Sequence, residues 1–237
     1  MFDKTKLETI LFLDIETVPE TASFSELSEI KQQLFAQKTE YQRKDEISPE
    51  EFYAKAGIWA EFGKIICISV GFFVDITNER SFRVKSFTGE EKSILEGFKT
   101  LLDGHFNKTE HLLCAHNGKE FDFPYIARRM IINNIPLPQK LNLFGKKPWE
   151  IAHLDTMDLW KFGDYKHYTS LNLLTNILGI PSPKEDIDGS QVADVYYKEN
   201  DLERIVKYCE KDTVSVAQLL LRFNNLPLLT EEEIIVV

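Results

Sequence analysis

Residues 10–17 have the sequence Ile-Leu-Phe-Leu-Asp-Ile-Glu-Thr, an apolar run that ends in two acidic residues. The unbroken apolar run predicts a buried β-strand, and the period of two along a strand places Asp14 and Glu16 on the same face. Two neighbouring carboxylates repel each other, so one takes up a proton unless a cation neutralises the pair. The pair therefore indicates a divalent-metal site, with a solvated strand end as the structural alternative.

A second segment with a candidate acid contains Asp122, which follows another predicted strand. The apolar residues up to Ala115 predict the strand, Asn117-Gly118 predicts its turn, and helical spacing of apolar residues from about Phe121 onward predicts a helix. Asp122 then lies in the first turn of that helix, where the helix dipole favours a carboxylate. A simple terminal charge is the alternative to a role in a metal site.

A third segment, residues 202–220, has the most regular helical pattern of the chain and contains Asp212. Its apolar residues recur at helical spacing, which puts Tyr208 and Asp212, four residues apart, on one face. A phenol and a carboxylate would project together from that face. The structural alternative is that Tyr208 packs half-buried and Asp212 is a solvated acid.

Together the three segments resemble the three exonuclease motifs of the DEDD superfamily of 3′-to-5′ exonucleases. The motifs correspond to residues 12–17, to Asn117 with Phe121 and Asp122, and to Tyr208 with Asp212. Tyrosine four residues before the last acid resembles the tyrosine branch, which includes the proofreading domains of family-B DNA polymerases. Segments 61–70, 153–159, 179–184 and 188–192 look most like stand-alone predicted exonucleases related to those domains.

The resemblance implies a two-metal reaction. Asp14, Glu16, Asp122 and Asp212 would hold two divalent cations, Mg²⁺ or Mn²⁺, because carboxylate oxygens are the ligands that these ions prefer. Such a pair neutralises a phosphodiester, activates a water and stabilises the departing 3′ oxygen. Tyr208 would orient the attacking water rather than deprotonate it, because an unperturbed phenol titrates at about pH 10.

The same resemblance suggests substrate contacts. Thr17 would contact the terminal sugar, and Asn117 would hold the substrate strand, although Asn117 and Phe121 are one residue further apart than is commonest in polymerase domains. Phe121 is expected to pack in the core more than to stack on a base. Arg128 and Arg129 are either phosphate contacts or ordinary solvated charges.

The composition does not by itself indicate nucleic acid, since 28 basic and 38 acidic residues give a net charge of −10. Residues 128–149 are the exception, because they contain five basic residues and no acid. They form either a basic lip beside the site or a solvated loop. Three widely spaced cysteines in apolar runs predict reduced packing residues in a cytoplasmic protein, and no apolar stretch is long enough to cross a membrane.

The order of predicted elements indicates an α/β fold, ribonuclease H-like, with a mixed five-stranded sheet flanked by helices. Strands are expected near 9–15, 65–74, 80–87, 111–116 and 151–155, and helices near 89–103, 120–133, 156–162, 169–178, 190–199 and 201–223. We expect one exonuclease domain over residues 1–237, with a helical insertion at about 20–62 and a short tail from about 225. The tail either adds an edge strand or docks on a partner.

The predicted function is a metal-dependent 3′-to-5′ exonuclease that acts on single-stranded or frayed DNA. An exoribonuclease is an alternative, since no residue visibly excludes a 2′-hydroxyl group. A catalytically silent nucleic-acid-binding module and a hydrolase of small phosphoesters also remain open on the same fold. We expect no polymerase domain in the chain, so a proofreading role would require a polymerase or repair partner.

Overall fold

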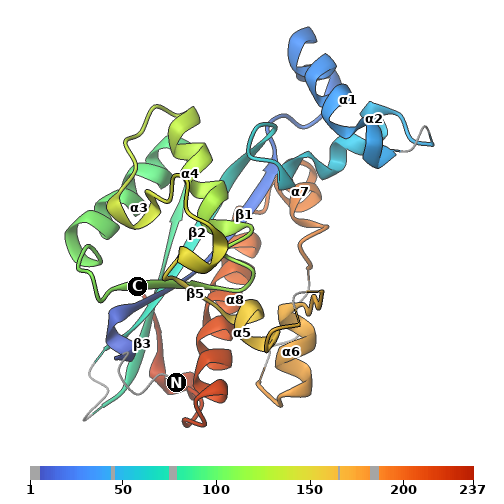
Figure 1. Ribbon diagram of the computed structural model, residues 1–237. Helices are drawn as coiled ribbons and strands as arrows, with labels where there is room; N and C mark the ends of the chain where they lie inside the picture. The colour runs from blue at the N-terminus through green and yellow to red at the C-terminus, as the bar shows by residue number, and fades with distance from the viewer. Residues whose placement is uncertain (1–5, 44–45, 75–78, 165, 182–186) are drawn as a thin grey trace.

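The computed structural model describes residues 6–43, 46–74, 79–164, 166–181 and 187–237, and it has a mixed six-stranded sheet flanked by helices (Figure 1). The strands are β1 (Ile10–Pro19), β2 (Gly63–Val74), β3 (Ser81–Thr88), β4 (Leu112–Ala115), β5 (Leu154–Asp155) and β6 (Ile234–Val236). Their order across the sheet is β5-β4-β1-β2-β3-β6, with antiparallel pairing of β1 with β2 and of β2 with β3. The other three pairs are parallel. The expected α/β class is confirmed.

The five expected strands are present, and the C-terminal tail adds a sixth at the edge of the sheet, which was one of the two expected alternatives for the tail. β6 pairs with β3 and is only 3 residues long, too short to stand out in the sequence. Arg80 holds the tail in place: its guanidinium lies 2.8 Å from Glu233 and donates to the carbonyls of Pro227 and Leu228. The hydrogen bond from Arg80 lowers the pKa of Glu233 to about 2.

Helices cover both faces of the sheet. They are α1 (Glu29–Arg43), α2 (Pro49–Phe52), α3 (Glu91–His105), α4 (Asp122–Ile132), α5 (Thr156–Trp160), α6 (Leu171–Ile177), α7 (Val192–Asp194) and α8 (Leu202–Phe223). Short 3-10 turns are η1 (Leu7–Thr9), η2 (Phe24–Glu26), η3 (Tyr53–Ile58), η4 (Gln139–Leu141), η5 (Pro148–Glu150) and η7 (Glu231–Glu233), and η6 (Val195–Glu199) is a π-helical turn. Within the described residues, no helix is both long and apolar enough to span a membrane.

Side chains alternate between the two faces of the sheet along β1, and this alternation determines the face on which Asp14 and Glu16 lie. Leu11, Leu13 and Ile15 pack in the cluster that includes α3 and α4. Ile10 and Phe12 pack on the opposite face, in the cluster that includes α8. Asp14 and Glu16 continue this second series, so their side chains lie on the α8 side of the sheet.

Residues 20–62 form a helical segment with a small aromatic core of its own. Phe35 is fully buried there and lies edge-on to the rings of Tyr53 and Phe62. A capping box is present at Ser48, with reciprocal bonds between Ser48 and Glu51. In Figure 1 this segment, in blue to cyan, projects beyond the end of the sheet at which β1 ends.

The segment is seated on β1 through Gly57. A Cβ atom at Gly57 would lie 3.1 Å from the backbone of Val18, so the two backbones are in close contact. The carbonyl of Gly57 accepts hydrogen bonds from the hydroxyls of Thr17 and Tyr125, each at 2.8 Å. The end of β1 that carries the acidic pair is therefore tied both to this segment and to α4.

Candidate active site

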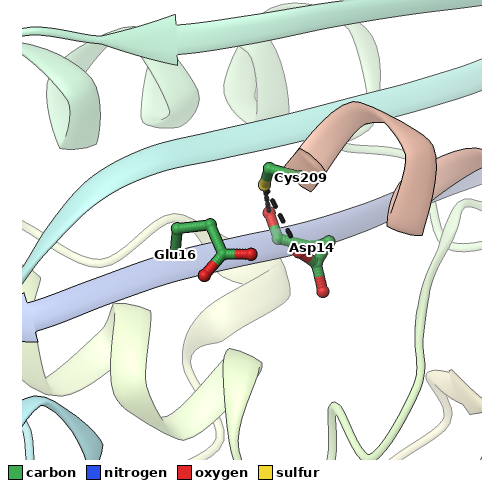
Figure 2. A group of neighbouring side chains, drawn as sticks. All are labelled: Asp14, Glu16 and Cys209. Carbon is green, nitrogen blue, oxygen red and sulfur yellow. Dashed lines mark hydrogen bonds between the residues drawn. The ribbon is translucent and has the colours of Figure 1, made fainter. Parts of the chain in front are cut away.

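Asp14 and Glu16 lie side by side beneath helix α8. Carboxylate oxygens of both residues lie within 4.8 Å of each other and of the Cys209 sulfur (Figure 2). Directly after Glu16 the pairing of β1 with β2 shifts register. Such a bulge bends a strand and redirects its side chains, and bulges are common next to active sites. The bulge separates Glu16 from Thr17, the residue proposed to meet the terminal sugar.

Cys209 is a member of this cluster that the sequence analysis interpreted only as a packing residue. It is fully buried on α8, and its Sγ–H group lies 3.4 Å from the carbonyl oxygen and 3.3 Å from Oδ2 of Asp14. Figure 2 shows the sulfur above the strand with both contacts directed at Asp14. Its position three residues before Asp212, almost one helical turn, was the signal that could have placed it here.

The four candidate acids influence one another, which shows that the fold brings them together. Burial raises the pKa of Asp14 well above its usual range, and the charges of Asp212, Glu16 and Asp122 add to that rise. Burial also raises the pKa of Glu16, with Asp212 as its largest charged neighbour. β1, α4 and α8 thus deliver carboxylates to one buried, strongly negative point.

Asp122 is the acid with the clearest shift. It is only 3% exposed, as the first residue of α4, and burial raises its pKa to about 8. The backbone amides of Asp122 itself and Ile15 oppose that rise, whereas Asp155 and Asp212 add to it. A cation bound beside this carboxyl group would favour its ionised form.

Asp212 contributes to the site from α8, and Tyr208 lies one helical turn before it. Both side chains are half-buried, and Tyr208 packs against the apolar cluster that contains Val18 and Ile205. Ile205 and Val216, on the same helix, are fully buried, so the apolar pattern of α8 fixes which way the helix turns its polar residues.

Asp155 fixes the loop that leads into α4. Its buried carboxylate accepts hydrogen bonds from the backbone amides of Asn117 and Lys119 at 2.9 and 3.0 Å. It also caps α5 by accepting from the amides of Met157 and Asp158. One carboxylate therefore joins the loop before Asp122 to the next strand, a role that the sequence analysis did not identify.

Asn117 occupies a special position in this loop. Its φ of 64° lies in the left-handed region, which asparagine tolerates better than most residues. Its side-chain oxygen is buried, with no hydrogen-bond partner among the residues that the structure describes. A buried polar atom of this kind is costly, and a bound ligand would supply the missing donor.

A cavity of about 570 Å³ opens beside the acidic pair. Glu16 and Thr17 line one wall, Lys55 and Ile58 of η3 line another, and Phe121 closes a third. This volume is within the ordinary range of small-molecule pockets. The cavity joins three of the residues that the sequence analysis proposed for metal and substrate binding.

Phe121 and the two arginines have three different environments. Phe121 is half-buried, 5.3 Å from the Tyr125 ring, and packs in the core as expected while one side lines the cavity. Arg128 is exposed on α4. Arg129 is buried in an ion pair with Glu91 and donates to the carbonyl of Ala60. The proposed substrate contact by Arg129 was therefore wrong, because its charge is already neutralised inside the protein.

A known protein family matches most of the chain. Residues 58–233 match the family described as predicted 3′-5′ exonucleases related to the exonuclease domain of PolB. The chain belongs to this family. The matched residues include Asp122, Tyr208 and Asp212 and begin after Asp14 and Glu16. The family's predicted activity implies a nucleic acid substrate.

The fold is also similar to a solved polymerase structure. The match to the family B DNA polymerase from the hyperthermophilic archaeon Pyrobaculum calidifontis has a TM-score of 0.54 and 17% sequence identity. It covers 90% of this chain and 24% of the polymerase chain. At this identity the likeness shows a common fold, and this chain spans about a quarter of the polymerase's length.

The donor set at the acidic cluster fits hard divalent cations. Its carboxylates come from three elements of the fold and are buried or half-buried, and Mg²⁺ and Mn²⁺ prefer such oxygen ligands. Burial and mutual repulsion raise the pKa values of Asp14, Glu16 and Asp122, and a divalent cation would offset that repulsion. The sulfur of Cys209 is the one soft donor in the group around Asp14 and Glu16.

Proposed function

We propose that this protein is a metal-dependent 3′-to-5′ exonuclease of the tyrosine branch, acting on single-stranded or frayed DNA. The observation that supports this most strongly is the mutual influence of Asp14, Glu16, Asp122 and Asp212, delivered by three separate elements. Family membership supports the reaction class, and the acids support the metal dependence.

Two divalent cations, when bound, would neutralise the scissile phosphodiester, activate a water and stabilise the departing 3′ oxygen. Asp14, Glu16, Asp122 and Asp212 would hold them. The chain itself contributes a rigid frame for these four side chains, because β1 is at the centre of the sheet and the Asp155 carboxylate fixes the loop before Asp122. Preorganised charge in a site from which water is largely excluded is the main protein contribution to such reactions.

Tyr208 is proposed to orient the attacking water through its hydroxyl group. A neutral phenol both donates and accepts a hydrogen bond, so it can position a water without taking its proton. Its ring is held by the cluster around Val18 and Ile205, which limits the directions in which the hydroxyl can point. The proposed role is therefore one of positioning, with ionisation of the water left to the cations.

The cavity beside Glu16 is proposed to hold the terminal nucleotide. Thr17 and Phe121 would contact its sugar, and the unpartnered oxygen of Asn117 would accept a hydrogen bond from the strand. A cavity of about 570 Å³ is large enough to hold one nucleotide. Residues 20–62 supply one wall of the cavity through η3, and we propose that they are an insertion into a single exonuclease unit whose tail begins at about 225.

The test compares substrates under one set of conditions. Single-stranded DNA, its RNA counterpart, blunt duplex DNA and a free nucleotide are each incubated with the protein and Mg²⁺ or Mn²⁺. The proposal predicts release of mononucleotides fastest from single-stranded DNA, and no release with a chelator or from the Asp14→Asn variant. Fastest release from RNA would establish the exoribonuclease instead.

Two outcomes would overturn the proposal. Hydrolysis of the free nucleotide without attack on either polymer would identify a small phosphoester hydrolase. Binding of single strands without any release, by a protein that remains folded, would identify a silent binding module. Equal rates on blunt duplex and single strand would remove the single-strand preference alone.

A further inference from the structure

A second groove extends from the first turns of α4 along its exposed face. It has a volume of about 380 Å³ and lies between α4 and residues 137–151, which loop beside the helix in Figure 1 in yellow-green to yellow. Pro124, Ala127 and Ile131 of α4 form one apolar wall, and Leu137 and Leu143 belong to the other. Ile131 is 49% exposed, so this apolar floor is open to solvent.

The groove is lined by cations in a chain that is acidic overall. Arg128 and Lys146 line it and are exposed, and no carboxylate pairs with either among the described residues. Lys119 also lines it but pairs with Asp158 at 3.1 Å. The segment 128–149 contains no acid, although the net charge of the chain is −10. A local excess of positive charge in such a chain indicates a polyanion as the ligand.

The other three cations of the expected basic lip are engaged elsewhere. Arg129 is buried against Glu91, and the Lys140 ammonium group donates to the carbonyls of Lys108 and His111. Lys147 lies outside the groove, with its ammonium group 5.3 Å from the centre of the Trp149 ring. Arg128 and Lys146 are therefore the two cations with an open position in the groove.

Aromatic side chains stand at the same edge. Phe144 lines the groove and is 75% exposed, and Trp149, close behind it in the chain, is 77% exposed. Exposed aromatic rings beside a positively charged groove are the combination that binds single-stranded nucleic acid, since each base can stack on a ring. A duplex would leave these rings without bases to stack on.

The groove starts where the acidic cluster ends. Lys119 and Phe123 line it, and they flank Asp122 in the chain. The cavity proposed for the terminal nucleotide lies on the other side of that cluster, against Glu16 and Thr17. A strand whose 3′ end lies in that cavity would therefore leave the site toward α4.

We propose that the groove between α4 and residues 137–151 binds the single strand on the 5′ side of the scissile phosphate. Arg128 and Lys146 contact its phosphates, and Phe144 and Trp149 stack on its bases. This inference rests on the proposed function and adds an extended binding surface that gives preference to longer strands.

The test uses the full chain with Arg128→Gln and Lys146→Gln combined. The matched control is Arg83→Gln with Lys85→Gln, two exposed cations on β3 that do not line the groove. Binding of a labelled strand of about 12 nucleotides is measured by fluorescence anisotropy with chelator present, over a range of salt. The groove variant is expected to bind about tenfold more weakly, and its salt slope is expected to fall by about 1.4, from about 0.7 per lost phosphate contact. The control is expected to match the wild type.

A second substrate separates this inference from the proposed function. The p-nitrophenyl ester of thymidine 5′-monophosphate occupies the terminal site and has no strand beyond it. The groove variant is expected to hydrolyse this ester at the wild-type rate and to digest the long strand more slowly. An equal loss of activity on both substrates, or equal binding of the long strand by both double variants, would overturn the proposal that this groove binds the strand. A wild-type protein that cleaves neither substrate would refute the proposed function, and the binding comparison would still decide the groove.

A second copy of this chain is the other occupant that the exposed rings would fit. Sedimentation analysis of the wild type and of Trp149→Ala tests it. A monomer in both cases supports the nucleic acid groove. A dimer that dissociates in the variant would assign the rings to an interface between copies and overturn the proposal.

Discussion

Asp122→Asn should stabilise the metal-free protein at neutral pH, although it removes a residue proposed for catalysis. The substitution keeps the size of the side chain and removes its ability to ionise. Burial raises the pKa of Asp122 from its usual 3.8 to about 8, so the folded protein retains a proton that the unfolded chain releases. Stability contributed by such a group is complete below about pH 4 and is lost as the pH rises toward about 8.

The size of the effect follows from that window. Each pH unit within it costs about 1.4 kcal/mol, so the wild type should lose about 3 kcal/mol relative to Asp122→Asn between about pH 5 and about pH 7. Asp14 and Glu16, whose pKa values are also raised in part by Asp122, add to the difference with the same sign. His153 acts oppositely, since burial lowers its pKa to about 4, but it is present in both proteins and cancels.

The assay is urea denaturation of both proteins with chelator present at several pH values. Saturating Mn²⁺ should then offset most of this difference, because a ligand at about 100 times its dissociation constant stabilises the folded state by about 2.7 kcal/mol. A wild-type protein whose stability relative to Asp122→Asn does not change with pH would refute the crowded-carboxylate reasoning. A variant that gains as much from Mn²⁺ as the wild type would remove Asp122 from the metal site.

Three further substitutions test separate parts of the structure. Arg129→Met leaves the carboxylate of Glu91 buried without its partner and should lower the free energy of unfolding, measured by urea denaturation, by about 3 to 5 kcal/mol. Arg128→Met on the exposed face of α4 should lower it by about 0.5 kcal/mol or less. Equal losses would contradict the environments assigned to the two arginines. Tyr208→Phe should lower kcat on single-stranded DNA about 100-fold with an unchanged melting temperature, and an unchanged kcat would remove the water-positioning role. Asp155→Ala leaves four backbone amides without their acceptor and should cost about 3 kcal/mol together with activity, so full activity would show that the loop before α4 holds its shape unaided.

The sequence predicted most of the fold because its strongest patterns come from burial. The run at residues 10–17 and the helical spacing in residues 202–220 correspond to β1 and α8, which lie against each other in the core. The sequence left open whether the tail forms a strand because 3 residues carry no period. The position of β6 depends on a contact between Arg80 and Glu233, which are far apart in the chain.

The sequence analysis predicted the charged residues of the candidate site but not the residues that hold them in place. The four acids were expected to converge because their three segments resemble the exonuclease motifs, and each acid also belongs to a predicted regular element. Cys209 and Asp155 were missed because their roles depend on contacts across the fold, to Asp14 and to the Asn117 amide. Arg129 was misassigned because its charge is paired with Glu91 on another helix, which no local pattern shows.

The most direct test of the account is digestion of a 5′-labelled single strand with Mn²⁺ by the wild type and by four single variants, Asp14→Asn, Glu16→Gln, Asp122→Asn and Asp212→Asn. Glu203→Gln, an exposed acid on α8, is the control. The account predicts a ladder that shortens from the 3′ end with the wild type and the control, and a loss of at least about 100-fold in each of the four variants, because residues that act as one unit fail together. A ladder that persists in any of the four folded variants, or release of the 5′ label as a mononucleotide without a ladder, would contradict it.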